Sequence, residues 1–300
     1  MVSAAPSVSI ILPTHNRMRT LPRAVHSVLA QTFRDFELIV VDDGSTDETR
    51  SWLESLNEPR LRLITLGGRS GAARARNTGI RAAQAPLIAF QDSDDEWLPH
   101  KLERQLTLMQ ASPAEVGWVG GGYRADSGTV SSAALVRGTG YDGELLVGAP
   151  FVTPTWLVRK DALLAAGLFD ETLPCLEDWD LIFKLADRCR FRAVEDVVLL
   201  RHGSEDSLYG DVDKRRRGLE VILSRHRQRW LKEPARYGRW YAELARLHGL
   251  NGAPAQSRQW LRQGLALNPW QPRAAALYAA SLCGSRVLKR FSRTRLAVAV

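Results

Sequence analysis

Three aspartates follow a short apolar run in the N-terminal half of the chain: residues 87–90 are apolar, and Asp92, Asp94 and Asp95 come directly after them. Crowded carboxylates repel one another unless a cation lies among them, and Mg²⁺ and Mn²⁺ prefer oxygen ligands and hold substrate phosphates. The Asp-x-Asp spacing therefore indicates a divalent metal bound to a nucleotide diphosphate. Acidic turns after strands are common, so the pattern by itself is equally typical of a solvated loop or a helix cap.

The apolar pattern around these acids switches between strand and helix periods, in the order expected of a sheet built from βαβ units. It predicts strands at residues 8–12, 36–41, 61–65 and 87–90, and helices at residues 21–29 and 71–85. Parallel strands place their carboxyl ends at one edge of a sheet, where such sheets bind ligands. We therefore expect Thr14, Asp43 and Asp94 to face one crevice.

A further acidic turn closes the second predicted strand. Asp42 and Asp43 end the strand, Gly44 permits a tight turn, and Asp47 or the hydroxyls before it can cap the next helix. Two more carboxylates thus meet the same edge of the sheet.

The order of these motifs resembles the inverting family-2 glycosyltransferases with a GT-A fold. Seven segments carry the resemblance: VSIILPTHN (8–16), FELIVVDDGSTD (36–47), ARNTGI (75–80), QDSDD (91–95), WLPHKL (97–102), GLFDE (167–171) and LEDWDL (176–181). Each segment alone is unspecific, but all of them in this order are strongly specific. The resemblance covers about residues 7 to 207 and implies an α/β fold, a Rossmann-like mixed sheet flanked by helices.

The resemblance also implies how the acidic motif and Arg76 would treat a nucleotide-sugar donor. Asp94 would bind Mg²⁺ or Mn²⁺ that bridges the diphosphate oxygens, and Asp92 and Ser93 would lie near the ribose and the metal's water shell. Arg76 follows a glycine-rich stretch within a predicted helix, from which its guanidinium could reach phosphate. The alternative for Arg76 is a solvent-facing helix arginine.

The remaining donor contacts implied by the resemblance come from the first two strand ends. Asp43 would accept a hydrogen bond from the base, and the turn of Pro13, Thr14 and His15 would cradle base and ribose. The His15 ring could stack on the base, or it could be a polar turn residue only.

Glu177 and Asp178 lie directly ahead of a helical apolar period, so both would occupy a first helical turn. Favourable charge placement at a helix N-terminus accounts for acids there, at about 0.3–1 kcal/mol each. The position in the resembled family implies more. It makes Asp178 the general base that takes a proton from the acceptor hydroxyl, with Glu177 orienting Asp178 or the acceptor.

Arg201 and His202 close the predicted catalytic portion. By their place in the resembled pattern, His202 would complete the metal shell or touch the diphosphate, and Arg201 would offset charge on the leaving group. A structural histidine is the alternative, because lone histidines are usually structural.

Composition fits a folded protein with one large α/β domain and an appendage: the chain has 300 residues and is 45% apolar. Its three cysteines, Cys175, Cys189 and Cys283, are scattered, which argues against a disulfide framework and a thiolate metal site. We find no signal peptide and no apolar stretch long enough to cross a bilayer, so we expect a cytoplasmic location.

Charge is distributed unevenly along the chain. Residues 214–300 carry 19 Lys and Arg against 3 Asp and Glu, a net charge of +16, whereas residues 1–213 carry 22 against 30, a net charge of −8. We therefore predict a catalytic domain at 1–213 and a basic helical extension at 214–300. Such a basic end suggests an anionic partner.

Apolar residues recur at helical spacing in this extension, and Gly249 and Pro269 would separate its helices. Residues 241–269 weakly resemble a tetratricopeptide-type helix pair, although one unit does not make a repeat array. Residues 285–296 alternate apolar and basic side chains, a pattern suited to an anionic membrane surface, with a solvated basic tail as the alternative. We expect no nucleic-acid partner, because no recognised module or aromatic platform accompanies the arginines.

Together these features predict an inverting, metal-dependent glycosyltransferase that moves a sugar, most plausibly from a UDP-linked donor, to a glycan or glycolipid hydroxyl in surface polysaccharide synthesis. Users of dTDP-rhamnose and GDP-mannose share comparable motifs. One alternative is a degenerate transferase-like scaffold that presents the basic helices to a partner, and another is a nucleotidyltransferase. The intact Asp43, Asp94 and Asp178 argue against the first, and the lack of a glycine-rich basic signature near the N-terminus argues against the second.

Overall fold

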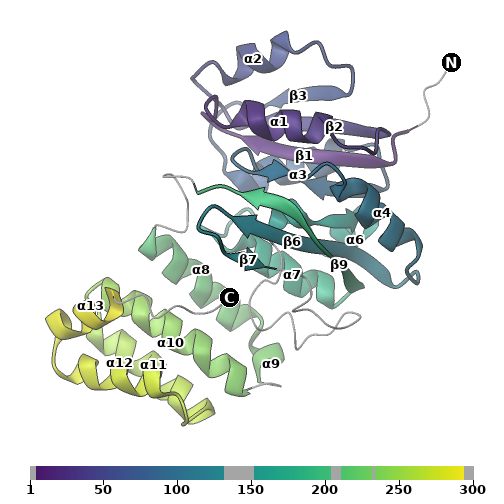
Figure 1. Cartoon of the computed structure of the whole chain (residues 1–300). Helices are drawn as coiled ribbons and strands as arrows, with labels where there is room; N and C mark the ends of the chain where they lie inside the picture. The colour runs from purple at the N-terminus through teal and green to yellow at the C-terminus, as the bar shows by residue number, and fades with distance from the viewer. Residues whose placement is uncertain (1–4, 132–151, 204–210, 232–233, 294–300) are drawn as a thin grey trace. The chain divides into compact units, whose positions relative to one another are not determined.

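The computed structural model describes residues 5–131, 152–203, 211–231 and 234–293 (Figure 1). Contacts divide the chain into two units. The first unit comprises Met1–Asp142, Pro150–Glu171 and Leu181–Glu205; the second, here called the helical unit, comprises Gly143–Ala149, Thr172–Asp180 and Asp206–Val300. Thr172–Asp180 therefore groups with the C-terminal helices although it lies well before them in the sequence. The domain boundary expected between residues 213 and 214 stays a prediction.

The first unit is built on one mixed sheet. Its strands are β1 Val8–Thr14, β2 Phe36–Asp42, β3 Leu61–Thr65, β4 Leu87–Phe90, β5 Glu96–Trp97, β6 Val116–Ala125, β7 Val130–Ser131, β8 Leu157–Arg159 and β9 Arg190–Arg201. The order is β3-β2-β1-β4-β8-β6-β9-β5, with β7 paired to β6. Strands β1 to β4 pair in parallel, whereas β8 joins the two halves by antiparallel pairing with β4 and β6. The α/β fold class expected from the sequence is confirmed.

The helices of this unit pack on both faces of the sheet. They are α1 Leu21–Leu29, α2 Thr49–Ser55, α3 Ala72–Ala82, α4 Lys101–Gln110, the 3₁₀ turn η2 Thr153–Thr155 and α6 Lys160–Ala165, and α7 Glu177–Ala186 runs into this unit from Leu181 onward. Helix α1 lies across β1 and β2 (Figure 1), where its buried stripe joins Ile10 and Leu12 in one core cluster. Ile11 points to the other face and meets α3, where a Cβ at Gly79 would lie 2.5 Å from Ile11 Cγ2. The period-2 alternation of β1 therefore serves two helix layers.

Helix α3 ends three residues earlier than the sequence predicts, at Ala82 rather than residue 85. The next backbone groups are taken by side chains of the sheet: Gln84 N donates to Glu37 Oε1 at 2.7 Å and Ala85 N donates to Ser9 Oγ at 3.0 Å. These bonds replace helical ones and turn the chain into β4, which is a long-range effect invisible to a local pattern.

A cluster of aromatic rings supports β4 just before the acidic motif. Phe90 contacts Trp156 and Phe169 edge-on, with ring centroids 6.1 and 5.6 Å apart. Trp118 extends the cluster from β6, 5.1 Å from Trp156. Such pairs add about 0.5–1.5 kcal/mol each beyond their burial, so the strand that carries the acids is firmly held.

A buried lysine lies beside this core. Lys101 at the start of α4 is almost fully buried, donates to Gln105 Oε1 at 2.7 Å, and places its Nζ 4.0 Å from the centre of the Trp97 ring. Burial lowers the pKa of Lys101 well below its ordinary value of 10.5. Loss of solvation disfavours the charged amine more than its contacts favour it.

We expect Lys101→Met to change how stability depends on pH. Between the folded pKa and about 10.4, the unfolded chain binds a proton that the folded chain lacks, so this lysine makes wild-type stability rise with pH. The methionine variant lacks that contribution, and the free-energy difference should shift toward wild type by up to about 1.4 kcal/mol per pH unit. Urea unfolding of both proteins from about pH 8 to about pH 10 measures it. A pH-independent difference would contradict a depressed pKa.

The helical unit contains α8 Val212–Arg225, α9 Arg227–Trp230, α10 Pro234–Leu250, α11 Pro254–Leu267, α12 Pro272–Leu282 and α13 Ser285–Arg293. Its core gathers Ala245, Leu261, Leu277 and Leu288, one from each of the last four helices. None of the described helices is long and apolar enough to cross a membrane.

The role expected of Gly249 is wrong. It lies within α10 rather than between helices, and the turn comes later, where Gly252 adopts a φ of 72°. A Cβ at Gly249 would lie 2.4 Å from Ser292 Oγ and 3.0 Å from Leu288 Cγ. The glycine lets α13 approach α10 closely, which a spacing argument reads as a helix break.

Candidate active site

The carboxyl ends of β1, β2 and β4 meet at one edge of the sheet. Thr14 pairs with Asp42 in register, Asp43 N donates to Thr14 O at 2.8 Å, and Gln91 N donates to Ile11 O at 3.0 Å. Thr14, Asp43 and the acidic motif therefore lie at the ends of adjacent strands, as the pattern predicts. Pro13 lies within β1, opposite Val41.

Asp43 ties two loops together at this edge. It is only 5% exposed, and its two carboxylate oxygens accept the backbone N–H groups of Ser70 and Gly71, each at 2.7 Å. Gly44 beside it has a φ of 76°, and a Cβ there would lie 2.9 Å from Gly68 Cα. Each carboxylate oxygen has a second lone pair, so Asp43 can still accept from a ligand.

His15 lies directly against this turn, with its Nδ1 2.9 Å from the carbonyl oxygen of Asp43. Asn16, next to it, has a φ of 51°, and its side-chain oxygen accepts from Thr46 N at 2.7 Å. The contact with Asp43 fixes the position of the imidazole. Stacking of His15 on a base stays a prediction.

Arg76 points into the protein rather than into solvent. It is 7% exposed, donates to Asp92 Oδ1 at 2.8 Å, and lies 5.5 Å above the Phe169 ring. The solvent-facing alternative is therefore wrong. Its partnership with Asp92 brings the third helix and the acidic motif together, and a buried guanidinium keeps its charge there.

Asp95 is the buried member of the acidic motif, and sequence reasoning gave it no role. Burial, together with the charges of Asp92 and Asp94, raises the pKa of Asp95 to about 8, against a backbone hydrogen bond from His202 and the charge of Arg201. That bond, His202 N to Asp95 Oδ1, measures 3.1 Å and links the end of β9 to the motif. The pKa of Asp95 is thus raised first by loss of solvation and then by the negative charge of its neighbours.

Two polar neighbours of the motif were also missed. Gln91 is fully buried and donates through Nε2 to Asp95 O at 2.9 Å, and Arg23 donates to Asp94 O at 2.6 Å. Ser93 is buried, and the Asp94 side chain is half-buried. The only sequence signal for Gln91 is a polar residue at the end of an apolar run.

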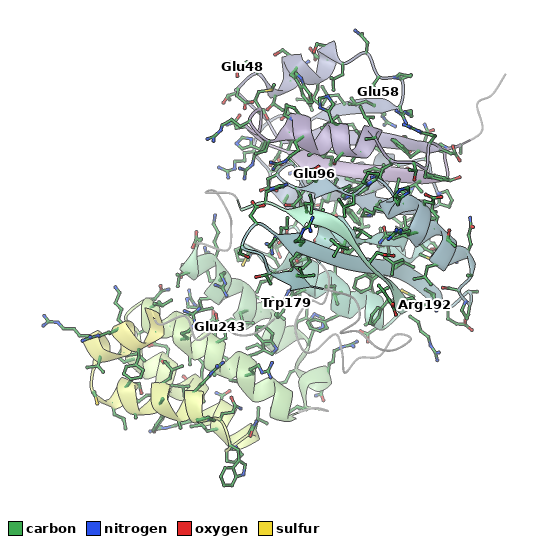
Figure 2. The ribbon with its side chains drawn as sticks, in the orientation of Figure 1. Glu48, Glu58, Glu96, Trp179, Arg192 and Glu243 are labelled. Carbon is green, nitrogen blue, oxygen red and sulfur yellow. The ribbon has the colours of Figure 1, made fainter. Side chains whose placement is uncertain are left out.

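His202 is oriented by a carboxylate that the sequence did not single out. Its Nδ1 lies 2.9 Å from Asp126 Oδ1, and because a carboxylate only accepts, this nitrogen carries the proton. In the neutral ring Nε2 then keeps its lone pair. Within the described residues Nε2 makes no hydrogen bond, and Oε2 of Glu96 lies 3.4 Å away. Figure 2 labels the Glu96 side chain.

Arg201, next to His202, lies with its guanidinium 5.8 Å from the centre of the Tyr123 ring. The ring restricts its position at the end of β9. A role in offsetting charge on a leaving group stays a prediction.

The residues at this edge fit a divalent cation that shares its ligands with a diphosphate. No group of three or more His, Cys, Asp and Glu side chains in the described parts of the chain could hold a metal alone. Mg²⁺-type sites commonly use only one or two carboxylates and take the rest from phosphates and water. The crowded carboxylates and the histidine nitrogen, held by a carboxylate in the way metal-binding histidines usually are, suit such a site.

Two further buried polar atoms face this region without partners. Thr14 Oγ1 and Gln91 Oε1 make no hydrogen bond to any described residue. Buried polar groups are normally satisfied, so atoms left without partners at a strand edge suggest contacts with a ligand or with water.

Glu177 and Asp178 occupy the first turn of α7, as expected. Asp178 Oδ1 accepts from Trp179 N at 2.9 Å. Both acids belong to the segment Thr172–Asp180 of the helical unit, whereas Asp43, Asp94 and His202 belong to the first unit. The part played by the two acids stays a prediction.

Comparison with known proteins agrees with the sequence interpretation. The chain is 44% identical over 102 residues to the UDP-Glc:α-D-GlcNAc-diphosphoundecaprenol β-1,3-glucosyltransferase WfgD of Escherichia coli, covering 34% of this chain and 40% of that protein. It is 40% identical over 131 residues to a protein named as the teichuronic acid biosynthesis glycosyltransferase TuaG of Bacillus subtilis, covering 43% and 52%. The matches thus span about half or less of these relatives.

A longer match and two solved structures extend the likeness. A protein named as the colanic acid biosynthesis glycosyl transferase WcaA of Escherichia coli is 30% identical over 66% of this chain and 74% of its own. Residues 1–349 of TarS from S. aureus, solved with UDP-GlcNAc, share the fold with a TM-score of 0.67 and 18% identity, over 96% of this chain and 91% of theirs. The mannosyltransferase PcManGT from Pyrobaculum calidifontis, solved with GDP-Man and Mn²⁺, gives 0.62 and 20% over 99% and 87%.

These neighbours confirm the GT-A-type sheet with helices at its C-terminal end. The model of glycosyl transferase family 2 matches residues 9–164, which is more than half of the chain and includes the acidic motif, the loop of Asp43 and the helix of Arg76. The chain therefore belongs to glycosyl transferase family 2.

Proposed function

We propose that this protein is an inverting, metal-dependent glycosyltransferase that takes a sugar from a UDP-linked donor and attaches it to a hydroxyl of a glycan or glycolipid in surface polysaccharide synthesis. The observation that carries the proposal is the convergence of Thr14, Asp43 and the acidic motif at the ends of β1, β2 and β4. Family membership and the sugar-nucleotide named for WfgD support it.

The donor's nucleoside would lie over the first two strand ends. Asp43 would accept from the base, and Pro13, Thr14 and His15 would line the base and ribose. Thr14 Oγ1 has no partner in the described chain and can bond to the ligand. Asp92 and Ser93 would contact the ribose, with Arg76 holding Asp92 in place at 2.8 Å and reaching toward phosphate.

Asp94 and His202 would hold the metal, whose charge when bound would neutralise the diphosphate as it leaves. The Asp126 carboxylate keeps the lone pair of His202 Nε2 available, which suits a ligand role. Arg201 would add positive charge where negative charge develops, and hydrogen bonds placed in advance are most effective there.

Asp178 would act as the general base. In an inverting displacement the acceptor hydroxyl attacks the anomeric carbon as the bond to the diphosphate breaks, and the base takes the hydroxyl proton during the attack. Glu177 would orient Asp178 or the acceptor. Their place at the start of α7 and the match to the family pattern support these roles.

Ligand-induced stabilisation tests the donor assignment. We expect UDP with Mn²⁺ to raise the melting temperature more than UDP with EDTA, and more than GDP, dTDP or CMP with Mn²⁺. A thermal-shift series of the four nucleotides with and without Mn²⁺ measures this. A rise with GDP or dTDP alone would name another donor base, and no rise with any nucleotide would favour a scaffold.

For the acceptor, we propose a lipid-linked glycan at the inner face of the plasma membrane, reached through α13. Arg286, Lys289 and Arg290 are exposed on one side of this helix, while Leu288 is buried in the helical core. Val287 and Phe291, 39% and 47% exposed, lie one turn apart beside the basic side. Basic and apolar side chains in this arrangement suit an anionic lipid surface.

Neutralising the three exposed basic residues should weaken membrane attachment. Each Lys or Arg near an anionic surface contributes about 1 kcal/mol, so Gln at positions 286, 289 and 290 should lower partitioning by about 100-fold. Sedimentation with vesicles of phosphatidylglycerol and phosphatidylcholine measures it, with pure phosphatidylcholine and added salt as controls. Equal pelleting of wild type and variant would leave only a solvated tail.

A further inference from the structure

The acid pair lies in a segment that groups with the C-terminal helices, whereas the other candidate residues belong to the first unit. Glu177 and Asp178 lie in Thr172–Asp180, a segment inserted between two parts of the first unit, yet its contacts place it in the helical unit. Such an arrangement is unexpected for an appendage that serves only to bind a partner.

Asp180, two residues after Asp178, makes one set of these contacts. Its side chain is fully buried, and Oδ1 accepts from Arg225 Nη1 at 2.8 Å and lies 3.0 Å from His226 Nε2. Arg225 is the last residue of α8, and His226 follows it. A buried carboxylate between two cationic or donor groups is costly to disturb, because removing one partner leaves the other buried and uncompensated.

Two further contacts fix the same segment by shape. A Cβ on Gly218 of α8 would lie 2.7 Å from the carbonyl oxygen of Cys175, so only glycine allows this approach. Trp179 lies edge-on to Trp240 of α10, with ring centroids 4.4 Å apart. Contacts before and after Asp178 thus come from two different helices.

The backbone between these contacts is strained. Leu176, directly before the acid pair, has a φ of 63°, a region that a leucine rarely adopts. Such residues persist where the surroundings hold them, and they concentrate at functional sites. We call these contacts the clamp: Gly218 against Cys175 before the acid pair, and Trp240, Arg225 and His226 against Trp179 and Asp180 after it. The clamp can hold Leu176 in this conformation.

We propose that α8 and α10 are positioning elements for the acceptor base, with Asp180, Arg225, His226 and Gly218 as positioning residues that fix the direction of Asp178. The inference rests on the proposed role of Asp178. The basic extension then contributes to catalysis, besides any contact with a membrane. Without the clamp, the segment Thr172–Asp180 would lose the conformation that directs Asp178. Misplacement of a catalytic group by about 1 Å can cost about 100-fold in rate.

The test uses the full chain and three variants. Asp180→Asn removes the charge that Arg225 and His226 share, Arg225→Gln is the milder change at a partly exposed side chain, and Gly218→Ala pushes a methyl group against the Cys175 backbone. Ser224→Ala, exposed on the same helix, is the matched control. Circular dichroism confirms that each variant is folded, and Arg225→Gln keeps the test valid if a harsher variant fails.

Two measurements distinguish the effect of the clamp on the segment from its effect on the rate of transfer. Hydrogen exchange should become about tenfold faster or more at amides of residues 172–179 in the variants, with the rest of the chain and Ser224→Ala unchanged. Transfer from UDP-glucose to a synthetic GlcNAc-diphosphate lipid should show kcat lowered by about tenfold to 100-fold, while the KM for UDP-glucose and the Kd for UDP stay within about twofold of wild type.

The outcomes are distinguishable. Unchanged exchange in all three variants would show that no clamp exists, and faster exchange with wild-type kcat would show that the clamp does not position the base. A rise in the KM for UDP-glucose at unchanged kcat would assign the helices to donor binding instead. If wild type transfers no sugar from any UDP, GDP or dTDP donor, the proposed function fails, and the exchange data still decide whether the clamp holds the segment.

Discussion

Replacing Asp178 with Asn should leave donor binding intact and lower kcat for transfer by about 100-fold to 10,000-fold. The amide has nearly the same shape as the carboxylate but cannot take the proton from the acceptor hydroxyl. Because the base acts only as the hydroxyl attacks, the Kd for UDP with Mn²⁺ and the KM for the donor should stay near wild type. Initial rates of UDP release with acceptor present, together with calorimetric titration of UDP, measure both quantities.

The matched control for this variant is Asp187→Asn, an exposed aspartate just after α7 ends. It changes the same chemical group close by in sequence, and its rate should equal that of wild type. Near-normal turnover of the Asp178 variant would remove this residue from the mechanism and return the two acids to a purely electrostatic role at a helix N-terminus.

Replacing Asp94 with Ala should instead weaken nucleotide binding itself. At a UDP concentration of about 100 times Kd, wild type with Mn²⁺ should gain about 2.7 kcal/mol of stability from the ligand. The variant should gain only what wild type gains in EDTA, because a carboxylate that holds the metal against the diphosphate is gone. Transfer should fall with binding, unlike in the Asp178 variant. Thermal unfolding with UDP, in Mn²⁺ and in EDTA, measures the part of this stabilisation that depends on the metal.

Asp161→Ala, an exposed aspartate of α6, serves as its control. A metal-dependent stabilisation of the Asp94 variant equal to that of wild type would show that the cation lies elsewhere. His202→Ala then becomes the next variant, because its Nε2 is the other candidate ligand.

The parallel half of the sheet could be predicted from the sequence because its signals are local. Each strand there is a short apolar run with a turn at its end, and β3 spans the predicted residues 61–65. The edge that gathers Thr14 and Asp43 followed from strand direction alone. The tight turn predicted at Gly44 is also a local signal, and the structure confirms it with a φ of 76° there.

The mixed half of the sheet, in which β6 pairs with β9 in parallel and the other pairings are antiparallel, could not be obtained in this way. Strand β8 has three residues and joins β4 to β6, and β9 pairs with both β6 and β5 across long stretches of chain. Such pairings depend on contacts between distant segments, which no local period encodes. Asp126 and Glu96 come from this half, so their contacts with His202 could not be predicted from the sequence.

In the helical unit, too, contacts between distant segments could not be predicted from the sequence. Its basic character and its helices could be predicted from charge and helical period. The close packing of Gly249 and Gly218 could not, because it involves atoms far away in the sequence. The burial of Asp180 was equally hidden, because an acid in a first helical turn has a sufficient local explanation.

The two hydrogen bonds that Asp43 accepts from Ser70 and Gly71 affect how tightly a nucleotide can bind. Two bonds of 2.7 Å fasten the loop of Ser70 and Gly71 to the loop that carries Asp43. Association then loses little conformational entropy in these loops, and more of the interaction free energy appears as affinity. A binding surface that is ordered in advance should therefore take up its nucleotide at low concentration.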